Sequence, residues 1–168
     1  MSKTIAHNSN VTCNENDLDV IKNIQTNLVD LVLNSAGLVI GSSSKKKVKL
    51  ANAIHYLIDG VLYTAAGAEV ALTATTHNVA AGKFAAFLVL IDAAGTVTFA
   101  KSADAASLAA VVLPAVPADN VVVGIVIINP TGTGNFVAAT TDLDDATVVP
   151  NAVYINTNYP FNPNSLAL

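Results

Sequence analysis

The sequence predicts a mainly β protein: an antiparallel β-sandwich or barrel body with one N-terminal helix and extended terminal arms. Residues 121–128 are aliphatic and mostly β-branched apart from one glycine, which is typical of a strand buried on both faces. Asp59-Gly60 lies between two apolar runs and forms a favoured hairpin turn, because both turn positions need a positive φ. A second hairpin is predicted around Asp92–Gly95, where Asp first and Gly fourth suit a type I turn. These segments together indicate an all-β unit.

The length of 168 residues is enough for one domain with a sizeable core and a tail or two. We divide the chain into an arm, helix and linker at 1–44, a β body at 45–157 and a tail at 158–168. Charged residues make up 12% of the chain, about half of the usual share. The surface must therefore be poor in charge, and such surfaces are often covered by a partner or by copies of the same chain.

Composition also excludes some classes of partner. All eight basic residues are lysines, and the net charge is −4, so we expect no nucleic-acid binding. The longest apolar run without proline or glycine, Phe84–Ile91, is far shorter than the roughly 20 residues of a membrane-spanning helix. The first residues lack the apolar core of a signal peptide, so we expect a protein made in the cytoplasm and not bound to membranes.

The N-terminal segment contains the one predicted helix, Asn16–Leu33, which Asn16 can cap. Apolar residues follow steps of three and four along it, in a heptad-like seam formed by Ile21, Ile24, Leu28 and Leu31. This seam either packs on the chain's own body or mediates self-association. Two heptads are too few to hold a coiled coil alone, so self-association would need help from the body. Residues 31–40 also fit a hairpin, because Gly37 suits a helix end or a turn.

A glycine–serine linker at 41–44 precedes a lysine cluster. In an extended segment, Lys45, Lys47 and Lys49 share one face. One interpretation is a charged edge strand, which prevents unwanted strand pairing. The other is a basic ridge that rests on an acidic partner surface.

The sequence patterns of the remaining predicted elements, within residues 102–163, are less regular. An alanine-rich short helix is expected within 102–112, and the two prolines of the following segment favour an extended chain. Residues 135–140 and 147–156 are expected to be the last strands. The tail carries Tyr159 and Phe161 on either side of Pro160 and is either disordered or an arm that docks its aromatic rings on a neighbour.

Catalytic and metal-binding patterns are not found. His7, His55 and His77 are scattered in different predicted elements, and Cys13 has no neighbour that would activate a thiol. The acidic run at 142–145 lacks the glycine and the ligand spacing of a calcium-binding loop. We therefore expect no enzyme, no metal and no cofactor.

Several runs resemble virion structural proteins of tailed bacteriophages, over roughly residues 50–150. The resemblance is carried by packing and turn motifs, and no catalytic residues come with it. The runs are Ile58–Thr64, Asn78–Phe84, Phe87–Val97, Leu113–Gly124 and Phe136–Asp144.

This resemblance implies a capsid decoration (cement) protein or a head fibre: a homotrimer on the capsid exterior that contacts the major capsid protein. Outside the resembling region, the lysine cluster and the aromatic tail themselves suggest partner contacts at Lys45, Lys47, Lys49, Tyr159 and Phe161. An alternative is a tail or head-fibre module that binds a host receptor or glycan, which predicts an exposed aromatic cluster. A third class, a small hydrolase domain, is disfavoured by the sparse histidines.

Overall fold

The computed structural model describes residues 30–129, 133–150 and 152–157. The described chain is mainly β, with three antiparallel sheets arranged as a sandwich and not as a closed barrel. Its one helical element is a short 3-10 helix, η1. In chain order the elements are β1 (Leu31–Val32), β2 (Leu38–Ile40), β3 (Lys47–Leu50), β4 (Ile54–Ile58), β5 (Val61–Ala65), β6 (Glu69–Ala71), β7 (Ala85–Asp92), β8 (Val97–Lys101), η1 (Leu108–Ala110), β9 (Asn120–Ile128) and β10 (Val153–Asn156).

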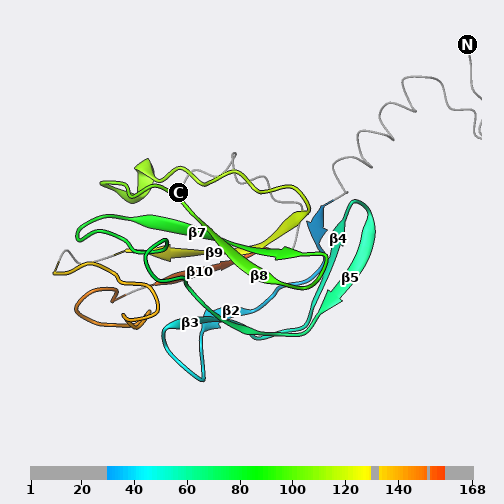
Figure 1. Ribbon diagram of the computed structural model, residues 1–168, viewed down its shortest axis with the longest axis horizontal. Coiled ribbons are helices and arrows are strands. Elements are labelled where there is room, and N and C mark those ends of the chain that lie inside the picture. Colours follow the sequence, from blue (N-terminus) through cyan, green and yellow to red (C-terminus); the bar gives the residue numbers. More distant parts are fainter. Residues whose placement is uncertain (1–29, 130–132, 151, 158–168) are drawn as a thin grey trace, which may run out of the picture.

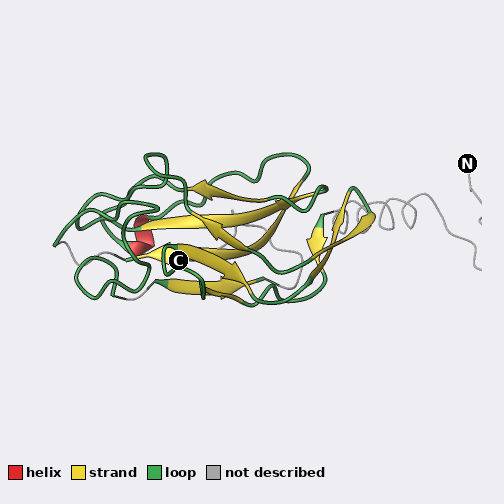
Figure 2. Cartoon of the chain, turned by 60° about the horizontal axis from the view of Figure 1, so that its bottom comes forward, coloured by secondary structure: helices red, strands yellow, loops and turns green. Residues whose placement is uncertain are grey.

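The largest sheet, with strand order β10-β9-β7-β8, forms the middle layer. The small sheets β1-β4-β5 and β2-β3-β6 share a core with one of its faces, through residues such as Tyr56, Leu50 and Phe87. The segment 102–118 covers the opposite face and contributes Val111 and Leu113 to a second core. Figure 1 shows this segment, in yellow-green, running over the top of the middle sheet, while β2 and β3 lie below it. Figure 2 shows the strands in stacked layers.

The two central strands are buried on both faces, as the sequence predicts for 121–128. Phe87 and Val89 of β7 belong to the first core, and Leu88 of the same strand belongs to the second. This arrangement follows from the alternation of side chains along a strand. A register shift beside Val89 places Gly124 of β9 opposite that residue.

Both predicted hairpins are confirmed. Asp59 and Gly60 have φ values of 50° and 74° and join β4 to β5. Tyr56 pairs with Tyr63 across this hairpin, and their rings stack with centroids 5.7 Å apart. In the second turn the Gly95 N–H donates to the Asp92 carbonyl at 3.0 Å.

The beginning of the body differs from the prediction. Leu31–Val32 is a strand that pairs with β4, so the predicted helix does not continue to Leu33. Residues 16–29, with Ile21, Ile24 and Leu28, lie outside the described residues. The body also begins before the expected boundary at Lys45, because β1 and β2 already belong to its sheets. In this region β1 pairs with β4 and β2 pairs with β3, and this tertiary pairing outweighs the local helical periodicity of the sequence.

Three further predictions are corrected. The alanine-rich segment 102–112 forms only the short η1, and residues 135–140 form no strand beyond an isolated bridge between Phe136 and Val79. The last strand is confined to Val153–Asn156. Within the described part of the chain, no helix is long and apolar enough to span a membrane.

Candidate interaction surfaces

The predicted lysine cluster lies on the exposed side of the sheet β2-β3-β6. Val48 and Leu50 of β3 are buried in the first core, so Lys47 and Lys49 point to the other side. We call this side the lysine face. The expectation of an edge strand is wrong, because β3 is the middle strand of its sheet. Lys45 lies in the turn before β3.

Two of the three lysines are already paired within the chain. The Lys45 Nζ lies 2.5 Å from the Asp144 carboxylate, and this hydrogen bond raises the pKa of Lys45. The Lys49 Nζ lies 3.9 Å from the Glu69 carboxylate and donates to the Ser42 Oγ at 2.8 Å. Lys47 forms no ion pair with any described residue. The free positive charge of the lysine face is therefore smaller than the sequence suggests.

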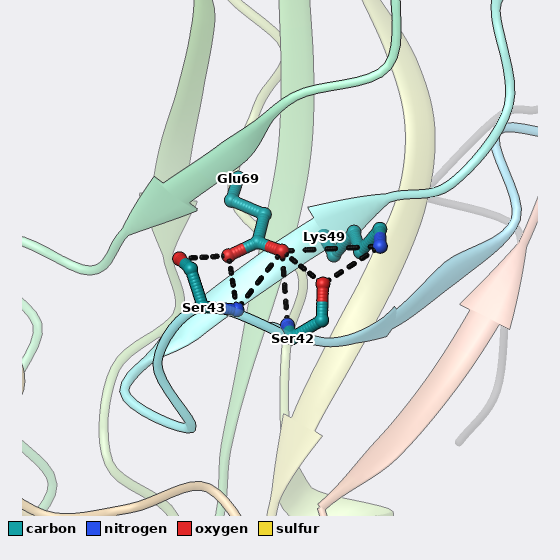
Figure 3. A network of polar contacts seen from close by, with 4 residues as sticks. All are labelled: Ser42, Ser43, Lys49 and Glu69. Carbon is teal, nitrogen blue, oxygen red and sulfur yellow. Dashed lines mark hydrogen bonds and ion pairs between the residues drawn. The ribbon is translucent and has the colours of Figure 1, made fainter.

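Glu69 of β6 fastens the loop between β2 and β3. Its carboxylate accepts the N–H groups of Ser42 and Ser43, at 2.9 and 3.0 Å, and both serine hydroxyls (Figure 3). These donors hold the pKa of Glu69 at about 2, well below its ordinary value of 4.5. The network holds the loop against the sheet at the border of the lysine face.

The Glu69 network predicts a loss of stability in acid. Because the folded-state pKa of about 2 lies below the ordinary 4.5, the carboxylate stabilises the fold fully above pH 4.5. This contribution is lost as the pH falls from 4.5 towards 2. Glu69→Gln should therefore be less stable than the wild type at pH 7, and the difference should shrink over this acidic range. Urea unfolding at a series of pH values measures it.

A direct titration of the glutamate carboxyl groups tests the lowered pKa of Glu69 itself. The chain has only two glutamates, Glu15 and Glu69, so carbon NMR on glutamate-labelled protein gives two carboxyl signals. One signal should titrate near 2 and move towards 4.5 in the double variant Ser42→Ala, Ser43→Ala. Two signals with the same ordinary titration in the wild type would contradict the network.

A second surface is formed by the outer side of the sheet β1-β4-β5. Ile54, Tyr56 and Ile58 face the core, so the alternate residues of β4 face outward. Leu62 pairs with Leu57 on this outer side and is 60% exposed. We call this side the leucine face. It comprises Leu33, Leu57 and Leu62, together with Leu31, which is buried at 8% exposure.

The first strand extends the leucine face. Leu31 pairs with Leu57, and the Leu33 N–H donates to the His55 carbonyl at 2.8 Å, which continues the register. Leu33 is 49% exposed. His55 and Thr64 lie on the same side, joined through Nδ1 and Oγ1 at 3.0 Å. This surface was not among the interaction sites predicted from the sequence. The hairpin register could have indicated it. This register pairs Leu57 with Leu62 on one side of the sheet and Tyr56 with Tyr63 on the other side.

The remaining described groups offer no assembled chemistry. His77 packs edge-on against Phe87 and Phe99, and its Nδ1 accepts the Thr73 N–H at 2.8 Å. Burial lowers the pKa of His77, which favours the neutral ring. No group of three or more potential metal ligands occurs among residues 30–129, 133–150 and 152–157.

One shallow groove of about 260 Å³ lies beside the start of β9. It is lined mainly by Val116, Pro117 and Ala118, together with Val121 and Val122. Asp30 is the ionisable group in this lining, and its carboxylate accepts the Asp59 N–H at 2.9 Å. The groove therefore presents no pair of groups for acid–base work.

In comparisons with known proteins, no family model, no curated protein and no solved structure matches the chain. The predicted contacts Tyr159 and Phe161 lie outside the described residues. The candidate surfaces are thus the lysine face and the leucine face.

Proposed function

We propose that this protein is a virion structural protein that binds the outside of a tailed-bacteriophage capsid and stabilises the shell, as a homotrimeric decoration (cement) protein. The observation that carries the proposal is the resemblance of residues 50–150 to phage virion proteins. Its runs include the β4–β5 hairpin, β7 with its turn, and the segment that leads into β9. The proposal places the protein in the virion and names the major capsid protein as its partner.

The surface chemistry suits such a role. Two cores pack against the faces of the middle sheet, and Lys47 of the lysine face presents an ammonium group that has no ion pair among the described residues. A protein that binds the assembled shell but not the free subunits stabilises the shell by mass action, by about 2.7 kcal/mol per site at 100 times the dissociation constant.

The test uses shells assembled from the major capsid protein encoded in the same genome. The purified protein should co-sediment with these shells and raise the temperature at which they disassemble. Absence of co-sedimentation at micromolar concentrations would refute the capsid role.

Charge reversal at Lys47 should weaken shell binding. Lys47 points outward from β3 and has no ion pair among the described residues, so Lys47→Glu changes the surface without breaking a described ion pair. We expect a several-fold weaker affinity that depends less on salt than wild-type binding does. Lys83→Glu is the matched control, because it makes the same change in charge outside the sheet β2-β3-β6. Equal effects of both variants would mean that only net charge matters.

The receptor- or glycan-binding alternative requires exposed aromatic side chains. The large aromatic residues Tyr56, Phe87 and Phe136 are fully buried, and no aromatic residue is among the large exposed hydrophobic side chains of the described chain. This distribution favours a shell-binding role over sugar recognition. Specific binding on a glycan array without binding to shells would reverse this preference.

A further inference from the structure

We infer that His77 is an acid-sensitive clasp: its neutral ring holds the turn 73–77 closed against the edge strand β8, and protonation of the ring opens this turn. The turn follows β6 and lies between Leu72 and Val79, which are both buried. This device does not depend on the capsid role, because its contacts all lie within the chain.

Two reciprocal hydrogen bonds close the turn. The His77 N–H donates to the Thr73 carbonyl at 3.1 Å, and the Thr73 N–H donates to the His77 Nδ1 at 2.8 Å. A backbone N–H can only donate, so Nδ1 must carry a lone pair and the ring proton must lie on Nε2. The closed turn therefore requires the neutral imidazole, because a proton on Nδ1 would point at the Thr73 N–H.

Backbone strain opposes the closed turn. Thr75 has a φ of 72°, in the left-handed region that β-branched residues avoid. Residues 73–76 are exposed, so little side-chain packing holds them in place. The turn thus depends on its two hydrogen bonds, and protonation of His77 removes one of them.

The packing of the ring disfavours a positive charge. His77 lies edge-on against Phe87 of β7 and Phe99 of β8, with ring centroids 5.6 and 5.9 Å away. Burial lowers the pKa of His77 below its ordinary 6.5, and the charge of Lys101 acts in the same direction. A hydrogen bond with the Phe99 backbone acts against them.

Few other charged groups surround the ring. Lys101 is the one ionisable residue of β8, pairs in register with Phe87 and forms an ion pair with Asp104. The strand β7 carries an ionisable group only at its last residue, Asp92. Residues 72–80 contain no ionisable side chain besides His77. The nearest described charge on these elements is therefore a cation that repels the protonated ring.

Acid should open the turn locally. The closed turn excludes the proton that an exposed histidine binds below its ordinary pKa of 6.5, so the closed state keeps its full stability above pH 6.5. As the pH falls from 6.5 towards the lower pKa of the closed form, the ratio of open to closed turn should rise by about tenfold per pH unit. Leu72 and Val79 are anchored in the first core, so the change stays between them.

NMR on the full-length protein tests the clasp above pH 4.5, where the Glu69 carboxylate remains charged. Spectra of the ring nitrogens should show His77 with its proton on Nε2 and a pKa below 6.5. In amide hydrogen exchange, the protection of Thr73 should fall over the same titration. The protection of Ile125, in the buried strand β9, should stay unchanged.

Two asparagine variants separate His77 from a general effect of acid. In His77→Asn, the side-chain Oδ1 can accept the Thr73 N–H and does not titrate, so Thr73 protection should become independent of pH in this range. His55→Asn is the matched control, because the His55 Nδ1 contacts the Thr64 hydroxyl, which can accept as well as donate. This variant should keep the wild-type dependence on pH.

Several outcomes would overturn the clasp. They are a His77 ring that titrates at or above 6.5, a Thr73 protection that does not follow this titration, and a His77→Asn variant with the wild-type dependence on pH. Loss of Ile125 protection together with that of Thr73 would also overturn it, because the acid effect would then be global unfolding. If His77→Asn does not fold, the titration and exchange of the wild type decide the question.

Discussion

Replacement of Phe87 by alanine is expected to lower the free energy of unfolding by about 3–5 kcal/mol. Phe87 is the third residue of β7, is fully buried and packs in the core between the middle sheet and the two small sheets. Its removal leaves a cavity that neighbouring strands cannot close without breaking their ladders. This loss is a large part of the roughly 5–15 kcal/mol that stabilises a typical domain.

Urea unfolding followed by circular dichroism measures the loss, since the chain contains no tryptophan. Protein concentration must be held constant, because self-association would contribute to the apparent stability. Val112→Ala is the control, and its effect at this exposed position should stay within about 0.5 kcal/mol. The His77 ring, 5.6 Å from the Phe87 ring, offers a second measurement. Burial lowers the pKa of His77, so the pKa should rise when Phe87 is truncated. A Phe87→Ala loss below about 1 kcal/mol would contradict the packing.

Local signals predicted the elements that local geometry decides. The Asp59-Gly60 turn sets positive φ at both positions, and this fixes the register that pairs Tyr56 with Tyr63. The β-branched run of β9 predicted burial on both faces, which the two cores confirm. Neither signal depends on distant parts of the chain.

Other features depend on contacts between distant segments and could not be predicted in this way. Leu31–Val32 is a strand because β4, more than 20 residues later, offers a pairing edge. The alanine-rich segment 102–112 is mostly irregular because its apolar residues cover the middle sheet. Each outcome reflects tertiary packing that overrides local propensity.

The candidate surfaces show the same division. Alternation correctly placed Lys47 and Lys49 on one side of a strand, but the position of β3 within its sheet depends on pairing with β2 and β6. Glu69 is 20 residues from Lys49 in sequence, so its network with the serine loop had no local signal. The leucine face could have been predicted in part, because the hairpin register alone pairs Leu57 with Leu62.

Gly124→Val is expected to destabilise the fold by about 3 kcal/mol, at the upper end of overpacking effects. A Cβ atom at this position would lie 2.5 Å from the Ile155 carbonyl oxygen and closer still to Leu38 Cδ1. The end of the Leu38 side chain can rotate, but the Ile155 carbonyl belongs to β10, which is paired with β9. A side chain at position 124 therefore separates the two layers or breaks the β9–β10 ladder. Urea unfolding at constant protein concentration measures the loss.

Two further experiments test whether the Leu38 side chain or the Ile155 carbonyl group causes most of this loss of stability. Gly134→Ala places a Cβ 3.6 Å from Val148 Cγ2, an ordinary contact, and should change stability by less than about 0.5 kcal/mol. In a double-mutant cycle, Leu38→Ala should recover part of the loss caused by Gly124→Ala, because it removes the side-chain obstruction and leaves the carbonyl in place. Full recovery of the free energy of unfolding would show that the Leu38 side chain is the dominant obstruction to a side chain at position 124. No recovery would show that the close approach of β10 alone requires glycine at this position, and a Gly124→Val variant as stable as the wild type would contradict both.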